Sequence, residues 1–407
     1  MERAERIAIT RQILDSIDSD QPYLGEECWE GDIGRFIDKD RFELEKQKLF
    51  LERPQLIALT GDVPEAGDYY ATDIAGKPIL LVRGKDGEVR AFLNACRHRG
   101  VPLAEGCGHG EGFTCPYHGW TYNNDGALIS VPSRQAFDPD KLRGLIPLQV
   151  VEEIGLVVVH PDPNGTFDFD EFMGPMKDHL KDKNLGEFRL VTARAEPGAI
   201  NWKHAVDGGM EAYHVPFLHP VTIGTDGGGH LPHVRFGDHH AFITSTPDIV
   251  KLRGIPEAEW PNSGGWGSVN AIFPNTVISD PVPAIFPDAP MSAPPPVMFF
   301  QRSEPGSEPG RCNYIFRTYA RPAKTAEEQQ RNEEFAKIMN RIAYEEDLLV
   351  QTASQKMMEA GAVPSVIFGK RESILTAMHK GYDEAIGHDV VAALRNNAVP
   401  MGISRLR

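Results

Sequence analysis

The sequence contains little cysteine and no long hydrophobic run. Five cysteines in 407 residues, an odd number, argue against a disulfide framework and leave metal binding or simple burial as their uses. The longest apolar runs, such as Pro78–Val82 and Ile154–Val159, are much shorter than the ~20 residues that a membrane span requires. The N-terminal segment 1–20 alternates charged with apolar side chains and lacks the apolar core of a secretory signal. We therefore expect a cytoplasmic protein with no transmembrane helix.

Basic residues are scarce relative to acidic ones. The chain has 42 lysines and arginines against 58 aspartates and glutamates, which gives a formal net charge of -16 at pH 7. A surface of this charge repels a phosphate backbone, so nucleic acid is not an expected partner. The composition, 41% hydrophobic and 25% charged, is that of an ordinary globular protein. The length predicts two or three domains.

Three regions with different patterns divide the chain. Residues 1–45 carry an amphipathic, charged pattern that predicts a short N-terminal helical arm. Residues 46–162 consist of short apolar runs separated by turn signals, which indicates a compact all-β domain. Residues 163–407 mix strand-like runs with helical patterns. The chain as a whole is therefore predicted to be α+β, with an all-β domain before a mixed one.

Turn and cap signals predict individual elements within these regions. Hairpin turns are expected at 84–88, 124–126 and 152–155, where glycines and acidic residues separate two apolar runs. A capping box at Thr325 starts the strongest helix, and apolar residues at helical spacing continue it to Ala353. A long C-terminal helix is therefore expected in the mixed domain.

Four metal-binding side chains form two short pairs within the all-β region. Cys96 and His98 are one residue apart, Cys115 and His118 are two apart, and 16 residues separate the pairs. Each pair follows a predicted strand, so each of two loops offers one thiolate and one imidazole. Two such loops can hold a [2Fe-2S] cluster with both cysteines on one iron and both histidines on the other, which is the Rieske arrangement. A structural zinc site usually orders a cysteine pair before a histidine pair, so the alternation favours the cluster.

The other three cysteines do not fit this pattern. Cys107 and His109 lie between the two pairs and would break the two-plus-two count of ligands. Cys28 and Cys312 have no histidine at ligand spacing. We interpret these three cysteines as non-ligands, and the last two as buried apolar residues.

A second group of candidate ligands lies in the segment NWKHAVDGGMEAYHVPFLHP. Asp207, Glu211 and His214, at spacings of four and three, are expected on one face of a helix. Pro216 is expected to end that helix, so that His219 returns from the next loop towards the first histidine. Two imidazoles and one carboxylate form the facial triad of non-haem Fe(II) oxygenases, which leaves positions open for dioxygen. A carboxylate from elsewhere in the chain is therefore required.

Three consecutive carboxylates on the predicted C-terminal helix could supply this ligand. They are Glu345, Glu346 and Asp347. Helical phase counted from Phe335 favours Glu346 slightly over Asp347, unless the helix is kinked. Two other interpretations stay open, because an acidic cluster is often a solvated helix face and a histidine pair with a carboxylate is often a hydrolytic zinc site.

Together these motifs resemble the α subunit of Rieske non-haem iron ring-hydroxylating oxygenases over nearly the whole chain. The first motif is C-x-H-x16-C-x2-H followed by Gly119-Trp120, and the second is NWK followed by EAYHVPFLH. The resemblance implies a Rieske [2Fe-2S] domain and a helix-grip-type catalytic domain with an antiparallel sheet and a long C-terminal helix. It also implies that His214, His219 and Asp347 bind mononuclear Fe(II), with Glu346 as the alternative carboxylate.

Position 211 departs from the pattern of many family members, which carry Asp where this chain has Glu211. In the family this acid bridges an iron-ligating histidine to a Rieske histidine of the neighbouring subunit. The resemblance assigns these two roles to His214 and His118 in a trimer. It also places Asn201 and Asp207 near the site, with Asp207 as an alternative relay acid.

The resemblance implies an oxidoreductase of aromatic hydrocarbon catabolism. Electrons from NAD(P)H would arrive through a reductase, with or without a ferredoxin, and O2 would hydroxylate or dihydroxylate an aromatic or cyclic substrate. A Rieske monooxygenase or an O- or N-demethylase on the same scaffold is the alternative. A Rieske protein that only transfers electrons and a zinc hydrolase are hypotheses from other classes. A homotrimer is expected, and an added small β subunit stays open.

Overall fold

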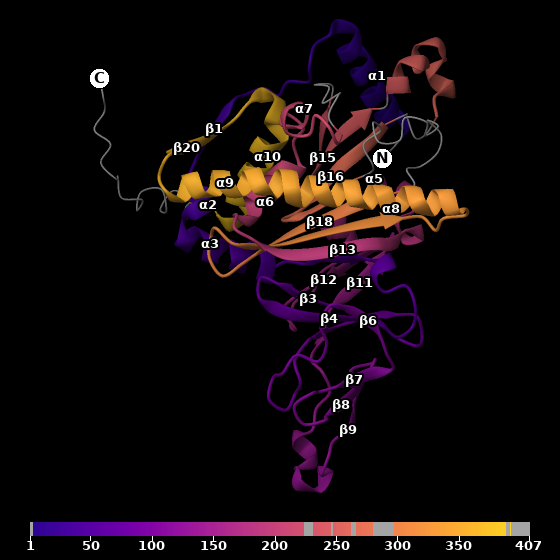
Figure 1. Ribbon diagram of the computed structural model, residues 1–407, viewed down its shortest axis with the longest axis vertical. Helices are drawn as coiled ribbons and strands as arrows, with labels where there is room; N and C mark the ends of the chain where they lie inside the picture. Colours follow the sequence, from indigo (N-terminus) through magenta and orange to yellow (C-terminus); the bar gives the residue numbers. More distant parts are fainter. Residues whose placement is uncertain are drawn as a thin grey trace.

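The computed structural model describes residues 3–223, 231–245, 247–261, 266–279 and 297–387, together with Val391. A smaller β-rich domain lies below a larger domain that contains a seven-stranded sheet and most of the helices (Figure 1). The predicted α+β class is confirmed. The two candidate metal sites lie in different domains.

Eleven short strands between residues 55 and 159 form the smaller domain. They are β2 (Gln55–Leu59), β3 (Asp68–Ile74), β4 (Lys77–Arg83), β5 (Val89–Leu93), β6 (Cys107–His109), β7 (Gly112–Thr114), β8 (Thr121–Asn123), β9 (Leu128–Ser130), β10 (Pro147–Leu148), β11 (Val150–Glu153) and β12 (Leu156–Val159). They pair in the orders β10-β5-β4-β3-β6, β7-β8-β9 and β11-β12-β2. The three predicted hairpins are confirmed, since β4 pairs with β5, β8 with β9, and β11 with β12. Gly126 and Gly155 make two of the turns at φ of 78° and 87°, a region that favours glycine.

A seven-stranded antiparallel sheet is the framework of the larger domain. Its strands are β13 (Arg189–Gly198), β14 (His233–Phe236), β15 (His239–Ser245), β16 (Trp266–Ile272), β17 (Thr276–Ser279), β18 (Val297–Pro305) and β19 (Cys312–Ala320). They pair in the order β13-β19-β18-β17-β16-β15-β14. Apart from the crossover that places β13 beside β19, neighbouring strands follow one another in the sequence.

The register of the sheet determines which side chains share a face. Phe242 pairs with Val269, Val269 with Ser279, and Ser279 with Phe299. Because residues paired across neighbouring strands point to the same side, these four side chains lie on one face of the sheet. This face packs against α6 (Trp202–Gly209), because Gln301 of β18 donates a hydrogen bond of 2.7 Å to a backbone carbonyl of that helix. We refer to it as the helix-covered face.

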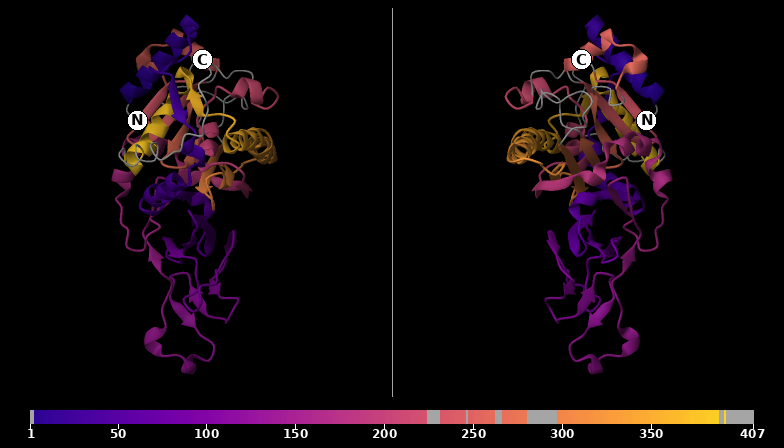
Figure 2. Two further views of the ribbon diagram at one scale, coloured as in Figure 1. Left: turned by 90° about the vertical axis from the view of Figure 1, so that its left-hand side faces the viewer. Right: turned by 90° about the vertical axis from the view of Figure 1, so that its right-hand side faces the viewer.

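The predicted C-terminal helix is present and runs further than the apolar pattern indicates. Thr325 caps α8 (Ala326–Arg341) by accepting a hydrogen bond from the Glu328 backbone N–H, as the capping box predicts. A π-helical segment, Ile342–Asp347, joins α8 to α9 (Leu348–Glu359). This long helix and the short helix α7 (Val215–Leu218) lie on the same side of the larger domain (Figure 2).

The remaining elements surround the sheet. On its other face, the apolar side chains of α4 (Phe169–Met173) and α5 (Pro175–Leu180) join a core cluster with residues of β2 and β12. The N-terminal segment forms α1 (Arg3–Ser19), β1 (Trp29–Asp32), α2 (Gly34–Ile37) and α3 (Lys39–Glu45). Near the end of the described chain, β20 (Ser365–Phe368) pairs with β1 and leads to α10 (Ser373–Ile386). The N-terminal segment therefore packs onto the larger domain.

Buried charged groups join the two domains. Arg302 of β18 donates hydrogen bonds to the carbonyl of Ile57 and the hydroxyl of Thr72, at 3.0 and 2.6 Å. Glu304 accepts a hydrogen bond of 3.0 Å from the backbone N–H of Ala75. Both side chains of β18 are fully buried and point away from the helix-covered face. These contacts fix the β-rich domain against the back of the sheet.

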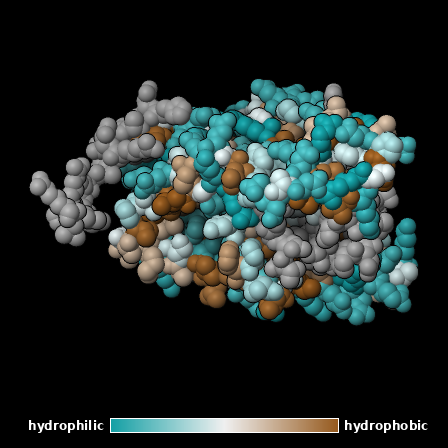
Figure 3. Space-filling model, turned by 90° about the horizontal axis from the view of Figure 1, so that it is seen from above, coloured by the Kyte–Doolittle hydropathy of each residue, from teal (hydrophilic) through white to brown (hydrophobic). Residues whose placement is uncertain are grey.

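Among the described residues seen from above, hydrophilic side chains predominate, and the hydrophobic ones lie in small groups (Figure 3). Among the described residues, no helix has both the length and the apolar character to cross a membrane.

Candidate functional site

Two loops of matching geometry hold the four candidate cluster ligands. In the first loop the Gly100 N–H donates to the Cys96 carbonyl at 2.8 Å, and in the second the Gly119 N–H donates to the Cys115 carbonyl at 3.0 Å. Both glycines have positive φ, 79° and 71°, which favours a residue without Cβ. Each loop follows a short strand, β5 or β7, as the sequence predicts. The motif therefore folds into two similar turns that face one another.

The four side chains of these loops converge. The imidazole rings of His98 and His118 lie 4.6 Å apart, and His98 stacks on Trp120 at 4.9 Å. Both cysteines are buried, and burial together with the neighbouring Cys96 thiol raises the pKa of the Cys115 thiol. Nδ1 of His98 is buried and has no hydrogen-bond partner among the described residues. Two adjacent thiols and two adjacent imidazoles, one with an unused nitrogen, suit a cluster with mixed ligands.

The residues between the two loops lie outside this group. Cys107 is exposed on β6, which pairs with β3, and His109 contacts Asp68 at 2.9 Å. Tyr122 is a contact that sequence reasoning missed: its hydroxyl lies 3.4 Å from Sγ of Cys96. The hydroxyl also accepts a hydrogen bond of 3.0 Å from the backbone N–H of Arg97. Tyr122 therefore places a polar group beside one candidate thiolate ligand.

The second candidate site is formed by three residues from two parts of the larger domain. His214, His219 and Asp347 each place one ligand atom within 4.8 Å of the others. Nε2 of His219 lies 3.0 Å from Oδ1 of Asp347, and Nε2 of His214 lies 3.6 Å from the same oxygen. His219 is buried, and its Nε2 has no hydrogen-bond partner among the described residues despite this short approach. Donor atoms that converge without bonding one another fit a shared cation.

Two further carboxylates hold the histidines from behind. Nδ1 of His214 donates a hydrogen bond to Glu211, and Nδ1 of His219 donates to Glu346 at 2.7 Å. With each Nδ1 occupied, the free Nε2 atoms face Asp347. Hydrogen bonds of this kind fix the tautomer and orientation of metal-binding imidazoles. Glu346 thus contacts a candidate ligand, while the carboxylate of Asp347 enters the ligand group itself.

A π-helical segment explains why Asp347 faces the two histidines, although helical phase favours Glu346. Residues 342–347 form this segment, and a π turn contains more residues than an α turn. Side chains that follow the insertion are rotated relative to an uninterrupted α-helix. As a result, Asp347 rather than Glu346 points between the two histidines. Arg341, on the preceding turn, contacts Glu346 at 3.0 Å.

The structure corrects the predicted helix around the two histidines. The helix α6 ends at Gly209, so Asp207 does not share a helix face with Glu211 and His214. Pro216 does not end a helix but lies in the first turn of α7, where proline loses only a backbone N–H that would be unpaired. Val215 is therefore helical, not extended. The histidines flank α7 as its two cap residues.

Close packing explains the two glycines at the end of α6. A Cβ on Gly208 would lie 1.9 Å from Nε2 of Gln351, and one on Gly209 would lie 3.0 Å from Oε1 of Gln301. Gln351 of α9 donates a hydrogen bond of 3.1 Å to the His204 carbonyl. The glycines therefore admit side chains from α9 and from the sheet against α6.

Asn201 and Asp207, the other two residues predicted from the sequence to lie near the iron site, contact groups outside the two candidate ligand sets. Asn201 caps α6 by accepting from the Lys203 N–H at 2.9 Å, and its amide donates to two backbone carbonyls. Asp207 accepts hydrogen bonds from Nε2 of His379 at 3.0 and 3.1 Å. No local pattern links His379 to this site, because it belongs to α10, far along the chain.

The carboxylates of the second site shift the pKa of one candidate ligand, His219. Burial alone disfavours the imidazolium of His219, but Asp347 and Glu346 outweigh burial and raise its pKa. Burial raises the pKa of Glu346, but hydrogen bonds from His219 and Thr222 outweigh burial and lower it. A site that collects positive charge between carboxylates suits a divalent cation.

Comparison with known families matches both domains. The Rieske [2Fe-2S] domain family matches residues 53–151. The ring hydroxylating alpha subunit family, catalytic domain, matches residues 185–388.

Individual relatives cover part of the sequence. The carnitine monooxygenase oxygenase subunit of Escherichia coli (strain K12) is 34% identical over 200 residues, which are 48% of this chain and 53% of the relative. The anthranilate 1,2-dioxygenase large subunit of Acinetobacter baylyi is 33% identical over 200 residues, which are 47% of this chain and 42% of the relative. In these sequence matches the chain spans about half the length of the curated relatives.

Solved structures share the fold over most of the chain. The naphthalene 1,2-dioxygenase of a Rhodococcus species, bound to indole, has a TM-score of 0.69 at 18% identity, over 93% of this chain and 98% of that one. The apo form of a quaternary ammonium Rieske monooxygenase has a TM-score of 0.69 at 20% identity, over 88% and 94%.

Proposed function

Because this chain belongs to the ring-hydroxylating oxygenase α-subunit family with a Rieske [2Fe-2S] domain, we propose that it is the catalytic subunit of a Rieske oxygenase that uses O2 and NAD(P)H-derived electrons to hydroxylate a small organic substrate. The observation that carries this proposal is the convergence of His214, His219 and Asp347 in a chain that also holds two opposed Cys-His loops.

The residues present fit two iron groups. Cys96, Cys115, His98 and His118 would hold the [2Fe-2S] cluster, and the facial group of two histidines and one aspartate would hold mononuclear iron. When bound, the cluster supplies single electrons and the mononuclear iron activates O2. We also propose domain limits of 1–45 for the arm, 46–162 for the Rieske domain and 163–407 for the catalytic domain.

The side chains of this chain have separable tasks in such a reaction. Glu211 and Glu346 accept the Nδ1 protons of His214 and His219 and so keep both Nε2 atoms turned towards Asp347. Burial of His219 keeps water away from one side of the site. Thr222 donates a hydrogen bond of 2.9 Å to Glu346, which holds this supporting carboxylate in place.

The helix-covered face of the sheet supports an uncharged ring as substrate. The buried apolar side chains on this face that cluster with Val206 and Met210 of α6 are Phe242, Val269, Ala271, Val277, Phe299 and Phe316. The buried polar side chains of Ser279, Gln301 and Thr318 lie among them. Among the described residues of β16–β18, the register places no charged side chain on this face, since Arg302 and Glu304 point the other way. Sites with such walls bind apolar ligands and use few polar groups for orientation. This supports an aromatic or cyclic substrate, the first expectation from the sequence.

Monooxygenation of a quaternary ammonium compound is the second candidate. It is favoured by similarity to carnitine and glycine betaine monooxygenase subunits, at 34% and 30% identity. A zwitterion of this kind needs charged or cage-forming partners.

O2 uptake and product analysis with a reconstituted reductase distinguish the two candidate functions. An aromatic acid or hydrocarbon that yields a hydroxylated or dihydroxylated ring supports the first candidate. Formaldehyde or trimethylamine released from a betaine supports the second, and no coupled O2 uptake with either class would contradict both.

A trimer is proposed for the assembly. The cluster loops lie in the lower domain, while α7 and the long helix lie in the upper one (Figure 1). Around α7, the side chains of Tyr213, Phe217 and Val221 are 50%, 77% and 79% exposed, which suits contact with a neighbouring subunit. Glu211, which accepts the Nδ1 proton of His214, would then lie between His214 of one subunit and His118 of the next, so that electrons would cross between subunits at this acid. A reductase, with or without a ferredoxin, is the proposed donor, a small β subunit stays open, and the cytoplasm is the proposed compartment.

Mixed trimers test this arrangement. His118→Ala should disable the cluster and Asp347→Ala should disable the iron site, so that each variant alone is inactive. If electrons cross between subunits, trimers reassembled from both variants recover part of the activity. No recovery in reassembled trimers would contradict the proposal.

A further inference from the structure

A buried acid–base pair lies outside both proposed ligand sets, and its acid, Asp207, comes four residues before Glu211 in the sequence. Nε2 of His379 donates to both carboxylate oxygens of Asp207, at 3.0 and 3.1 Å. Asp207 is near the end of α6, and His379 lies in the middle of α10. Both side chains are buried, at 5% and 0% exposure. The pair joins α6 to a helix that carries no proposed iron ligand.

Aromatic rings fix the histidine of this pair in place. The His379 ring lies 5.9, 5.6, 5.1 and 5.6 Å from the rings of Trp29, Phe36, Phe368 and Tyr382. Three of these rings come from other elements than α10. The imidazole therefore has one orientation, with Nε2 towards Asp207.

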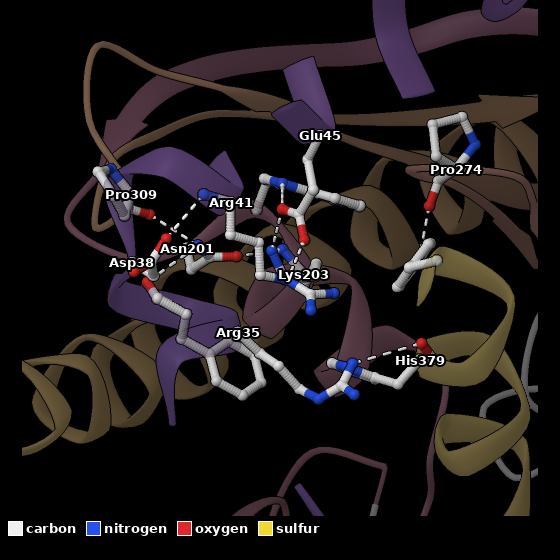
Figure 4. A network of polar contacts seen from close by, with 12 residues as sticks. Arg35, Asp38, Arg41, Glu45, Asn201, Lys203, Pro274, Pro309 and His379 are labelled. Atoms are coloured by element: carbon white, nitrogen blue, oxygen red, sulfur yellow. Dashed lines mark hydrogen bonds and ion pairs between the residues drawn. The ribbon is translucent and has the colours of Figure 1, made fainter. Parts of the chain in front are cut away.

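A network of charged groups fixes the backbone around the pair (Figure 4). The carbonyl of His379 accepts a hydrogen bond of 3.4 Å from Arg35, which also pairs with Asp383. Arg41 bridges Asp383 and Glu45, and Glu45 pairs with Lys203 at the start of α6. The N-terminal segment thus clamps α10 to the start of α6 at Lys203, and the Asp207–His379 pair ties α10 to the end of α6.

Two carboxylates of one short segment have different partners. Asp207 and Glu211 are four residues apart, and the family resemblance names Glu211 as the relay acid and Asp207 as its alternative. In the structure Glu211 accepts the Nδ1 proton of His214, while Asp207 is held by His379. Burial raises the pKa of Glu372, and Glu211 and Asp207 raise it further, so the three acids lie within electrostatic range of one another. A buried carboxylate that loses its partner is strongly unfavourable and must move or take up a proton.

We propose that His379 is a positioning residue: by holding Asp207 it fixes the end of α6, and with it the segment that brings Glu211 to His214. The inference rests on the proposed function, because it concerns the geometry of the proposed iron site. His379 touches no proposed ligand and acts only through Asp207.

Three variants of the full-length, iron-loaded protein test this role. His379→Leu removes the N–H donor, whereas His379→Gln keeps an N–H donor of similar reach. The control is His179→Leu, because His179 is also buried and bonded, to Asn270 at 2.9 Å, but lies on the opposite face of the sheet. Thermal unfolding and iron and sulfide content are measured for each variant. The two readouts are the EPR spectrum after nitric oxide is added to the anaerobic reduced protein, and the rate at which O2 reoxidises the reduced cluster.

The proposal predicts a pattern that simple destabilisation does not give. H379L should change the EPR anisotropy of the nitric oxide adduct and slow cluster reoxidation on the order of 10- to 100-fold. H379Q should stay close to the wild type, and H179L should lower the unfolding temperature without changing either readout. Wild-type spectra and rates in H379L, equal damage in H379Q, or the same EPR change in H179L would each overturn it. If H379L does not fold, H379Q decides, because wild-type behaviour supports the role of the N–H donor and altered EPR contradicts it. A wild-type protein without iron and sulfide would instead overturn the proposed function.

Discussion

Nε2 of His219 lies 3.0 Å from Oδ1 of Asp347, and this contact joins the short helix α7 to the long C-terminal helix. His214 approaches the same oxygen at 3.6 Å from the other end of α7. The three groups face each other only because a π-helical segment turns Asp347 inward. The candidate iron site thus depends on a local departure from regular α-helix. Such π-helical turns are frequent at functional sites.

The two neighbouring carboxylates should differ when each is replaced. Asp347→Ala removes a proposed ligand, so we expect loss of the mononuclear iron with retention of the cluster. Glu346→Gln keeps the size of the side chain that supports His219, so iron should remain but bind about 10- to 100-fold more weakly. Iron and sulfide analysis after dialysis against a chelator measures both effects. Loss of iron in E346Q with retention in D347A would reverse the assignment.

Tyr122 should tune the cluster. Its hydroxyl lies 3.4 Å from Sγ of Cys96, and hydrogen bonds to cluster sulfurs stabilise the reduced, more negative state. Tyr122→Phe should therefore lower the midpoint potential without loss of iron. Redox titration followed by visible absorbance checks this. Tyr69→Phe, in the same core but without such a contact to a cysteine, is the control. An unchanged or higher potential in Y122F would contradict a role for the hydroxyl.

A methyl group on Gly208 should destabilise the catalytic domain. The added Cβ would meet Nε2 of Gln351 at 1.9 Å, so α9 must move or the amide must leave its hydrogen bond. We expect Gly208→Ala to cost about 1–3 kcal/mol in the free energy of unfolding. Gly381→Ala is the matched control, since Gly381 also lies within a helix but a Cβ added there would have none of the described residues within 4 Å. Gly381→Ala should raise the free energy of unfolding by about 0.5–1 kcal/mol. Equal effects from both substitutions would show that helix propensity, not packing, decides.

Asp383 should contribute stability that depends on pH. Burial alone would raise the pKa of this carboxyl, but Arg35 and Arg41 outweigh burial and lower it. A carboxyl with a lowered folded-state pKa stabilises fully above its unfolded pKa of about 3.9, and the contribution is lost as the pH falls through the folded value. Asp383→Asn should therefore cost about 3–5 kcal/mol near neutral pH. The cost should shrink below about pH 4.

Urea unfolding at a series of pH values measures this difference. Asp178→Asn is the control, because Asp178 pairs with Lys181 on the surface and should change stability little at any pH. A cost for D383N that stays constant down to acid pH would show that the ion pairs with the two arginines do not account for it.

Local patterns in the sequence predicted the parts of the fold that depend on few residues. The hairpins and the helix cap at Thr325 follow from turn and cap chemistry within a few positions. The grouping of His214, His219 and a carboxylate from the long helix was also anticipated, because a family pattern accompanied it. Whether these residues bind iron stays a prediction until the metal is measured.

Other features depend on distant packing and could not be read from local sequence. Helical spacing predicted one helix through Asp207 and His214, but Gly208 and Gly209 end α6 where α9 and the sheet approach it. The π-helical segment that turns Asp347 inward could not be predicted from the spacing of apolar residues. His379 was missed entirely, because only the packing of α10 against α6 brings it to Asp207.

Metal and sulfide analysis of the anaerobically purified protein, combined with EPR before and after dithionite, tests the central claim most directly. The account predicts about three irons and two sulfides per chain, with a reduced signal whose average g lies below that of an all-cysteine cluster. Two irons and two sulfides, with no mononuclear iron even after incubation with Fe(II), would leave only an electron carrier. Zinc without sulfide would contradict the account altogether.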